Sequence, residues 1–209
     1  SDWIALDTEA DSIHCYPERL CLLQFSFAGG EVLIDPLARL DLSPLLQVLR
    51  DRELILHGAD YDLRLLYRGL GYVPAKVFDT MLAARFLGLR EFGLTDLAAR
   101  FLGIRLVKGP QKANWTRRPL TPEMVEYALN DTRHLKRLAD LLRQQLVVLG
   151  RLTWHQEACD RLIEECSRPR QRNLDQAWRL PGSDRLAPPA LAVLRALWHW
   201  REQEAVRTN

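Results

Sequence analysis

The sequence is poor in cysteine and contains no long apolar run. Its four cysteines, Cys15, Cys21, Cys159 and Cys166, lack the close pairing typical of zinc sites and are sparse for a disulfide scaffold. No apolar stretch approaches the roughly 20 residues that span a bilayer, and no signal peptide opens the chain. We therefore expect reduced thiols in a cytoplasmic protein that has no membrane partner.

The chain also lacks a strong net charge. A formal charge of +2 over 209 residues gives no overall basic signal, so any argument for a nucleic-acid partner must rest on local clusters. Hydrophobic residues make up 47% and charged residues 27%, which is enough for a sizeable core. One large domain, or one domain with a small appendage, fits this length. Because the first residues lead directly into a strand, we expect the N-terminus to be trimmed.

Two acidic residues stand at the end of the first predicted strand. Residues 3–9 (WIALDTE) read as a buried strand that runs out into polar residues. Asp7 and Glu9 are two apart and therefore project from one face. Crowded carboxylates repel each other unless a cation neutralises them, and Mg²⁺ and Mn²⁺ prefer such oxygen ligands. The alternative is a strand end with two solvated acids.

Further strands and helices predict an α/β fold. Residues 20–27 and 31–35 flank a glycine-containing turn and are expected to pair as a hairpin. The short apolar run 54–56 predicts a fourth strand. Ser43 and Pro44 supply a cap and a first-turn proline for a helix that ends at about residue 50.

The junction after the fourth strand carries another acidic site. Residues 57–62 (HGADYD) lead into a helix over 63–68, with Asp60 as the candidate N-cap. Such strand-to-helix junctions are where α/β proteins place ligand groups. Asp62 is expected to point inward, toward the sheet, where a carboxylate needs a partner or a metal. We interpret His57 as a structural, hydrogen-bonding histidine.

A basic segment follows two further predicted helices, 79–87 and 95–102. Between Leu97 and Pro122 the chain carries six basic residues and no acidic one. Within it, residues 108–119 (KGPQKANWTRRP) form a loop with one tryptophan. Cations of this kind track phosphates, and an aromatic ring can stack on a base. A solvated loop whose tryptophan packs into the core is the alternative.

The last acidic site lies near the start of the longest amphipathic run. Residues 121–122 (TP) open a helix that is predicted to continue to Gly150. Tyr127 and Asp131 are four apart and therefore share one helix face, beside the apolar stripe. The alternative partner for Asp131 is a nearby arginine such as Arg133 or Arg137.

Taken together, these signals resemble a known family. An Asp-x-Glu at a strand end, an Asp at a strand-to-helix junction and a later Tyr-x-x-x-Asp resemble the three exonuclease motifs of the DEDD superfamily, tyrosine subclass. From residue 1 to about 150 the sequence is similar to the ribonuclease D family. The matching segments are 6–11 (LDTEAD), 20–25 (LCLLQF), 57–63 (HGADYDL), 78–80 (FDT), 108–111 (KGPQ), 115–121 (WTRRPLT) and 127–131 (YALND).

The resemblance implies a ribonuclease H-like fold, in which a mixed five-stranded sheet is flanked by helices, with a C-terminal helical extension. It also implies two divalent ions, Mg²⁺ or Mn²⁺, that clamp the scissile phosphate for an in-line displacement. Asp7 is expected to bridge both ions. Glu9 and Asp131 would complete the ion that holds the attacking water, and Asp62 would support the other ion. Tyr127 would orient that water.

The implied activity is that of a 3′-5′ exoribonuclease. Such an enzyme removes nucleoside 5′-monophosphates from single-stranded RNA 3′ ends, and the family suggests tRNA precursors or other stable RNAs. The candidate RNA-binding residues are Gln24, Lys108, Gln111, Trp115 and Arg118.

Two other functions compete with this one. The first is a DNA 3′-5′ exonuclease of the branch related to the Werner helicase, which shares the three motifs. The second is a non-catalytic RNA-binding scaffold that descends from the nuclease. For the domains, we expect an exonuclease domain at 1–150. Residues 151–209 would form a helical linker and the first helix of a truncated helicase-and-RNase-D C-terminal domain, beginning near Pro188.

Overall fold

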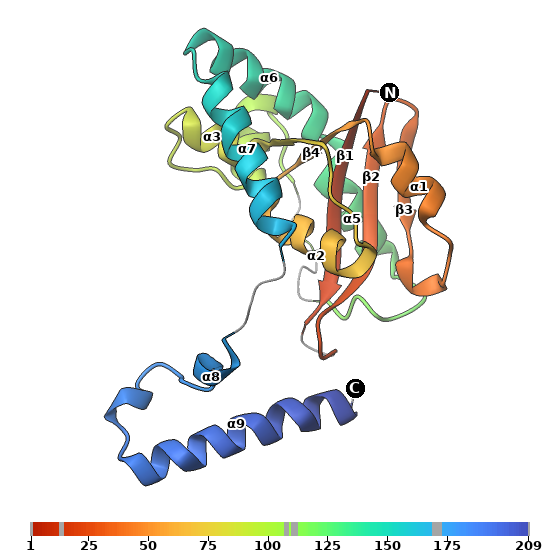
Figure 1. The fold of residues 1–209 in the computed structure, drawn as a ribbon. Helices are drawn as coiled ribbons and strands as arrows, with labels where there is room; N and C mark the ends of the chain where they lie inside the picture. Colours follow the sequence, from red (N-terminus) through yellow and green to blue (C-terminus); the bar gives the residue numbers. More distant parts are fainter. Residues whose placement is uncertain (1, 13–14, 107–108, 110–112, 169–172, 209) are drawn as a thin grey trace. The chain divides into compact units, whose positions relative to one another are not determined.

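The structure is a computed structural model that describes residues 2–12, 15–106, 109, 113–168 and 173–208 (Figure 1). Its strands are β1 (Trp3–Asp11), β2 (Arg19–Phe27), β3 (Gly30–Ile34), β4 (Glu53–Leu56) and β5 (Lys76–Asp79). They form one mixed five-stranded sheet in the order β3-β2-β1-β4-β5. β1 pairs antiparallel with β2 and parallel with β4, while β3 extends the antiparallel side and β5 the parallel side. The mixed five-stranded sheet implied by the resemblance is confirmed.

Helices cover the sheet and continue toward the C-terminus. The α-helices are α1 (Ser43–Leu49), α2 (Asp60–Leu70), α3 (Thr80–Phe86), α4 (Leu94–Leu97), α5 (Pro122–Arg133), α6 (Leu135–Val148), α7 (Leu152–Cys166), α8 (Leu174–Ala177) and α9 (Pro188–Thr208). Short 3₁₀ turns occur at η1 (Pro36–Ala38) and η3 (Ser183–Arg185), and a π-helical turn, η2 (Ala98–Leu102), directly follows α4.

The side chains of β1 alternate between two cores. Leu6 lies in the core that the sheet shares with α2 and α7, whereas Ala5 lies in the core shared with α3 and α6. β1 is therefore buried on both faces, as expected for a central strand with helices on either side. By the same alternation, Asp7 and Glu9 follow the face of Ala5, and Thr8 follows the face of Leu6.

The carboxylate of Asp79 organises the two strand-to-helix junctions beside β1. It caps α3 by accepting a hydrogen bond from the Met81 amide (2.8 Å), as expected for an N-cap aspartate. It also accepts from the amides of Gly58 (3.0 Å) and Ala59 (2.8 Å), just before α2. The prediction that Asp60 caps α2 is wrong, because Ala59 occupies the cap position and Asp60 is the first helical residue.

Two predicted helices differ from those in the structure. The helix expected from residue 122 to 150 is divided at His134, whose φ of −106° and ψ of −4° end α5 and begin α6. The helix expected over 95–102 starts at Leu94 and changes from α to π geometry at Ala98. Neither change alters the apolar pattern along the chain, so periodicity alone gives no sign of them.

By packing, the chain divides into a larger unit, Ser1–Asp11 with Arg19–Arg168, and a smaller unit, Ser12–Glu18 with Pro169–Asn209. Within the smaller unit, the Trp178 ring has the guanidinium groups of Arg179 and Arg195 at 4.8 Å and 5.9 Å from its centroid. The predicted domain division at residue 150 stays a prediction. Within the described residues, none of the helices combines the length and the apolar character that crossing a bilayer requires.

Candidate metal and active site

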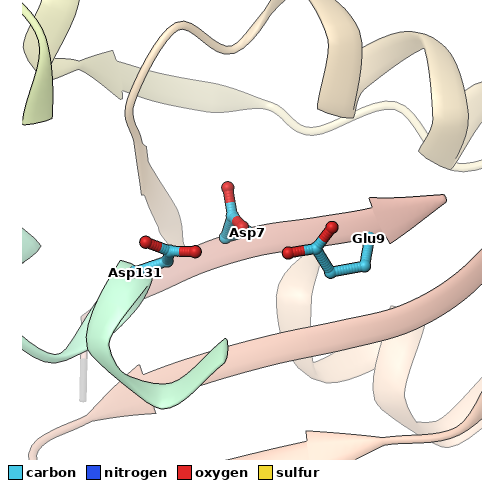
Figure 2. A group of neighbouring side chains, drawn as sticks. All are labelled: Asp7, Glu9 and Asp131. Carbon is cyan, nitrogen blue, oxygen red and sulfur yellow. The ribbon is translucent and has the colours of Figure 1, made fainter. Parts of the chain in front are cut away.

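Three carboxylates converge between β1 and α5. Asp7 and Glu9 project from β1 and Asp131 from α5, and all three point into a shared space (Figure 2). One oxygen from each lies within 4.8 Å of the others. Glu9 is buried, and the other two are half-buried. The two acids of β1 thus share one face, as predicted from their spacing.

Local contacts hold α5 against the sheet so that Asp131 reaches this space. Thr121 caps the helix by accepting from the Met124 amide (3.2 Å), and Pro122 follows at the first turn. The buried hydroxyl groups of Ser26 in β2 and Thr132 in α5 are hydrogen-bonded to each other at 2.7 Å. These contacts act on both ends of the segment that carries Tyr127 and Asp131.

Arg133 does not neutralise Asp131. Its guanidinium forks onto both oxygens of Glu31 in β3 (2.7 Å and 2.9 Å) and also contacts Glu126 (3.1 Å). Arg133 as the alternative partner for Asp131 is therefore wrong, and this arginine instead ties α5 to the edge of the sheet.

Asp62 approaches from the other helical layer. It lies on the first turn of α2 and is 5% exposed, which agrees with the prediction that its side chain points inward. The backbone amide of Thr8 (3.1 Å) and the Thr8 hydroxyl (2.6 Å) both donate to its Oδ1. Asp62 is not part of the tight group of three, yet its charge is close enough to raise the pKa of Asp7.

Burial disfavours the ionised form of all four acids, and repulsion from neighbouring acids adds to this effect at Asp7 and Glu9. Burial, followed by the charges of Asp62, Asp131 and Glu9, raises the pKa of Asp7 well above its ordinary value. Burial and the nearby charges raise the pKa of Glu9 to about 9, and burial raises that of Asp62 to about 7. Burial also raises the pKa of Asp131 to about 6, although a hydrogen bond from Tyr127 opposes the shift.

The four carboxylates fit a divalent cation. Among the described residues, no lysine, arginine or histidine forms an ion pair with any of them. Buried charges that lack a partner are costly, and proteins resolve such clusters by protonation or by binding a metal. An all-oxygen donor set is the kind that Mg²⁺ and Mn²⁺ prefer.

Tyr127 lies one turn before Asp131 and is half-buried. Burial, together with the charges of Asp131, Glu9 and Asp7, raises the pKa of its hydroxyl. Its ring packs near Trp115, with 6.1 Å between centroids.

Two histidines are hydrogen-bonded to the protein itself. His57 Nδ1 lies 2.9 Å from the Thr80 hydroxyl, which confirms its interpretation as a hydrogen-bonding residue. His155 Nε2 lies 3.0 Å from the Asp79 backbone oxygen. Within the described part of the chain, the three acids above are the only group of such residues close enough to hold a metal.

Three of the predicted RNA-binding residues, Trp115, Gln24 and Arg118, are buried or bonded to the protein itself, and their role in RNA binding stays a prediction. Trp115 is 1% exposed and packs with Leu22 and Met124, so its ring is closed to a base and the core-packing alternative holds. Gln24 is 0% exposed on β2, directly across from Asp7. Within the described residues its amide has no hydrogen-bond partner.

Arg118 is fully occupied by the protein itself. Its five N–H groups donate to both carboxylate oxygens of Asp35 and to the backbone oxygens of Cys21, Trp115 and Arg117. No donor is left for a phosphate. The remaining two candidates, Lys108 and Gln111, lie outside the described residues.

Two residues beside the acids were not singled out from the sequence. Thr8 donates hydrogen bonds to Asp62. In the sequence, the only indication of this contact is that Thr8 lies between two acids and therefore projects from the opposite face of the strand. Gly109 passes so close to Tyr127 that a Cβ atom there would lie 1.9 Å from the ring carbon Cδ2. Only glycine can lie this close to the ring. The KGPQ segment of the sequence gives no indication that its glycine contacts Tyr127.

Comparison with known proteins identifies the family. A sequence model described as 3′-5′ exonuclease matches residues 1–147. The chain is similar to ribonuclease D of Zymomonas mobilis, with 36% identity over 100% of this chain and 54% of that protein. It therefore belongs to the 3′-5′ exonuclease family, and the resemblance to ribonuclease D is confirmed. The chain spans about half the length of the curated relatives it matches.

Solved structures agree with this assignment. Escherichia coli RNase D, described as an exoribonuclease involved in structured RNA processing, superimposes with a TM-score of 0.79 and 30% identity, over 99% of this chain and 56% of that one. Brucella melitensis NrnC with bound Mg²⁺ superimposes with a TM-score of 0.71 and 25% identity, over 90% of this chain and 89% of that one.

Proposed function

We propose that this protein is a metal-dependent 3′-5′ exoribonuclease, with Asp7, Glu9, Asp62 and Asp131 as metal ligands and Tyr127 as a further catalytic residue. The observation that carries the proposal is the convergence of Asp7, Glu9 and Asp131 within 4.8 Å, without a cationic partner among the described residues. Family membership and the Mg²⁺ bound by Brucella NrnC support the same conclusion.

Two divalent ions, when bound, would supply the charge that stabilises an in-line attack of water on the terminal phosphodiester. Asp7 lies between the other acids and is suited to contact both ions. Glu9 and Asp131 would complete one site, and Asp62 would complete the other. Mg²⁺ and Mn²⁺ both fit the oxygen donors, and the choice between them belongs to the same proposal.

The proposed role of Tyr127 is to orient the attacking water molecule. Because the pKa of its hydroxyl is raised, the phenol stays protonated at neutral pH and is a poor general base. It can donate to Asp131 and accept from a water molecule, which would direct a water lone pair toward phosphorus. The residue would thus align the nucleophile while the ions provide the charge.

The proposed substrate is the 3′ end of single-stranded RNA, such as a tRNA precursor, and the product is a nucleoside 5′-monophosphate. The similarity to E. coli RNase D, whose description names structured RNA processing, supports RNA over DNA. We assign this activity to residues 1–150, with 151–209 as a helical linker and the start of a further helical domain. A cytoplasmic setting accords with the four free cysteines.

The central test is Asp7→Asn, which removes a carboxylate charge with little change in shape. Incubation of 5′-labelled RNA with Mg²⁺ or Mn²⁺ should give a ladder that shortens from the 3′ end with the parent protein. Asp7→Asn should lose at least about 100-fold in rate while still binding RNA. The matched control is Asp51→Asn, at an exposed aspartate, which should behave like the parent. Equal trimming by Asp7→Asn would rule out the metal centre, and RNA binding without trimming by the parent would favour the scaffold function.

Substrate choice needs a separate comparison. Matched single-stranded RNA and DNA of one sequence, followed under the same metal conditions, should show faster trimming of RNA, because the 2′-hydroxyl is the group that distinguishes the two. Faster loss of the DNA would assign the protein to the DNA exonuclease branch instead.

A further inference from the structure

We propose that Thr8 is a positioning residue that holds Asp62 in register with the two acids of β1. The inference rests on the proposed function, because it concerns how the fourth carboxylate of the same centre is oriented. Thr8 has no direct role in that function and is not itself a candidate ligand.

The side chain of Thr8 points away from the two acids that flank it in the sequence. Thr8 lies between Asp7 and Glu9 on β1, so its side chain projects from the opposite face, toward α2. There it is 6% exposed and meets a carboxylate 54 residues away in the sequence. β1 therefore carries two carboxylates on one face, and on the opposite face it carries Thr8, which is hydrogen-bonded to the carboxylate of Asp62.

Two donors from this single residue converge on one oxygen atom. The backbone amide and the hydroxyl of Thr8 lie 3.1 Å and 2.6 Å from Asp62 Oδ1. Hydrogen bonds to a carboxylate are short and strong, and a pair from two directions restricts both the position and the rotation of the group. Because both go to Oδ1, neither of these two donors occupies Oδ2, which can face a cation or water bound to one.

Of the two donors, only the hydroxyl can be removed by substituting the side chain of Thr8. Any residue except proline offers the amide at position 8, but only threonine and serine carry a hydroxyl on the β-carbon. Groups that orient metal ligands in this way typically change metal affinity or activity by about 10- to 100-fold when they are removed. The prediction is therefore specific to the hydroxyl and not to the volume of the side chain.

The test compares Thr8→Val with Thr8→Ser. Valine keeps the branched shape and the preference for strands but removes the donor, whereas serine keeps the donor and loses a methyl group. For Thr8→Val we expect kcat to fall by about 10-fold or more, and the half-saturating Mn²⁺ concentration to rise by a similar factor. KM for RNA should stay within about two-fold. Thr8→Ser should stay within about three-fold of the parent in every parameter.

A direct readout does not depend on turnover. Mn²⁺ binding to the protein alone, followed by electron paramagnetic resonance, should weaken in Thr8→Val and not in Thr8→Ser. In an Asp62→Asn background, Thr8→Val should add no further weakening, because the residue acts through Asp62. Thermal melting of each variant in EDTA shows that it is folded before metal is added.

Three results would overturn the inference. The first is a Thr8→Val protein with the metal dependence of the parent. The second is a Thr8→Ser protein as impaired as Thr8→Val, because packing rather than the hydroxyl would then matter. The third is full additivity with Asp62→Asn. All three presuppose a parent that trims RNA and an inactive Asp7→Asn variant, so failure of the proposed function is recognised separately.

Discussion

The hydroxyl of Tyr127 lies in a buried and negatively charged setting, where its pKa is raised. Tyr127→Phe removes the hydroxyl and keeps the ring that packs near Trp115. We expect kcat to fall by about 10- to 100-fold, below the full effect of losing a general base, with KM for RNA little changed. Steady-state trimming of labelled RNA measures both parameters. A phenylalanine variant with parental kcat would remove Tyr127 from the catalytic group.

Gly109 offers an independent way to disturb the same ring. In Gly109→Ala the new Cβ atom would lie 1.9 Å from Tyr127 Cδ2, so either the loop or the ring must move. We expect a loss of kcat as large as that of Tyr127→Phe, and little additional loss when the two changes are combined. Gly69→Ala is the matched control, because its Cβ would meet Leu20 at an ordinary 3.4 Å. An active Gly109→Ala enzyme would contradict the close approach.

At the scale of single residues, the sequence was informative about charge and less so about contact. Asp7, Glu9 and Asp131 could be brought together from their spacing and from a family resemblance. Trp115 could not be assigned, because a tryptophan in a basic loop has the same sequence pattern whether it stacks on a base or fills the core. Its burial depends on Met124 of α5 and on Leu22 of β2, and Leu22 is far from it in the chain.

The joint between β2 and α5 determines where Asp131 stands. The Ser26 and Thr132 hydroxyls are buried and 2.7 Å apart, and Thr132 in turn lies 3.4 Å from the Leu129 backbone oxygen. Thr132→Val leaves the Ser26 hydroxyl buried without its partner, which should lower the free energy of unfolding by about 1–3 kcal/mol. Adding Ser26→Ala should recover part of that loss. Urea denaturation of the four proteins in the cycle measures the coupling.

An exposed threonine supplies the control for this cycle. Thr95→Val lies on the surface of α4 and should change the free energy of unfolding by less than about 0.5 kcal/mol. If Thr132→Val is equally mild, the hydroxyl pair does not anchor the helix. A double variant as unstable as the sum of the single changes would also contradict the coupling.

At the scale of elements, long and strongly patterned segments were predictable, and short or subtle ones were not. Nine residues in β2 make a clear apolar strand, whereas the four residues of β5 are too few to distinguish from a helix start. The break at His134 was invisible because the apolar spacing continues through it. The π-helical turn that begins at Ala98 contains no residue type that distinguishes it from an ordinary α-helix.

For the whole molecule, the clustered acids make stability depend on pH and metal. Burial and neighbouring charge raise the pKa of Glu9 from 4.5 to about 9, whereas an unfolded chain ionises this group near its ordinary value. Between those values the native state holds more protons than the unfolded state, so the free energy of unfolding falls as pH rises. The half-buried His57 and the buried His155 have pKa values lowered by desolvation and act in the opposite direction, but only below about pH 6.5.

We therefore expect the metal-free protein to melt at a lower temperature at pH 8.5 than at pH 7. Mg²⁺ at about 100 times its Kd adds about 2.7 kcal/mol, which corresponds to a rise in Tm of about 5–10 °C for a chain of this size. At one fixed Mg²⁺ concentration the rise should be larger at pH 8.5, because the metal binds more tightly to ionised ligands. Thermal melts with EDTA or Mg²⁺ at both pH values measure it. Asp7→Asn is the control and should show a much smaller rise. An equal rise at both pH values would contradict the linkage.

Asp7 and Asp131 lie on the first strand and the fifth helix, and the other four strands run between them in the chain. An ion shared by these two side chains would close that chain into a loop, much as a covalent bond does, but one that a chelator can open. The central strand and the helix that covers it could then separate only after the metal leaves. The carboxylates proposed to bind the metal would then also act as a removable cross-link within the fold.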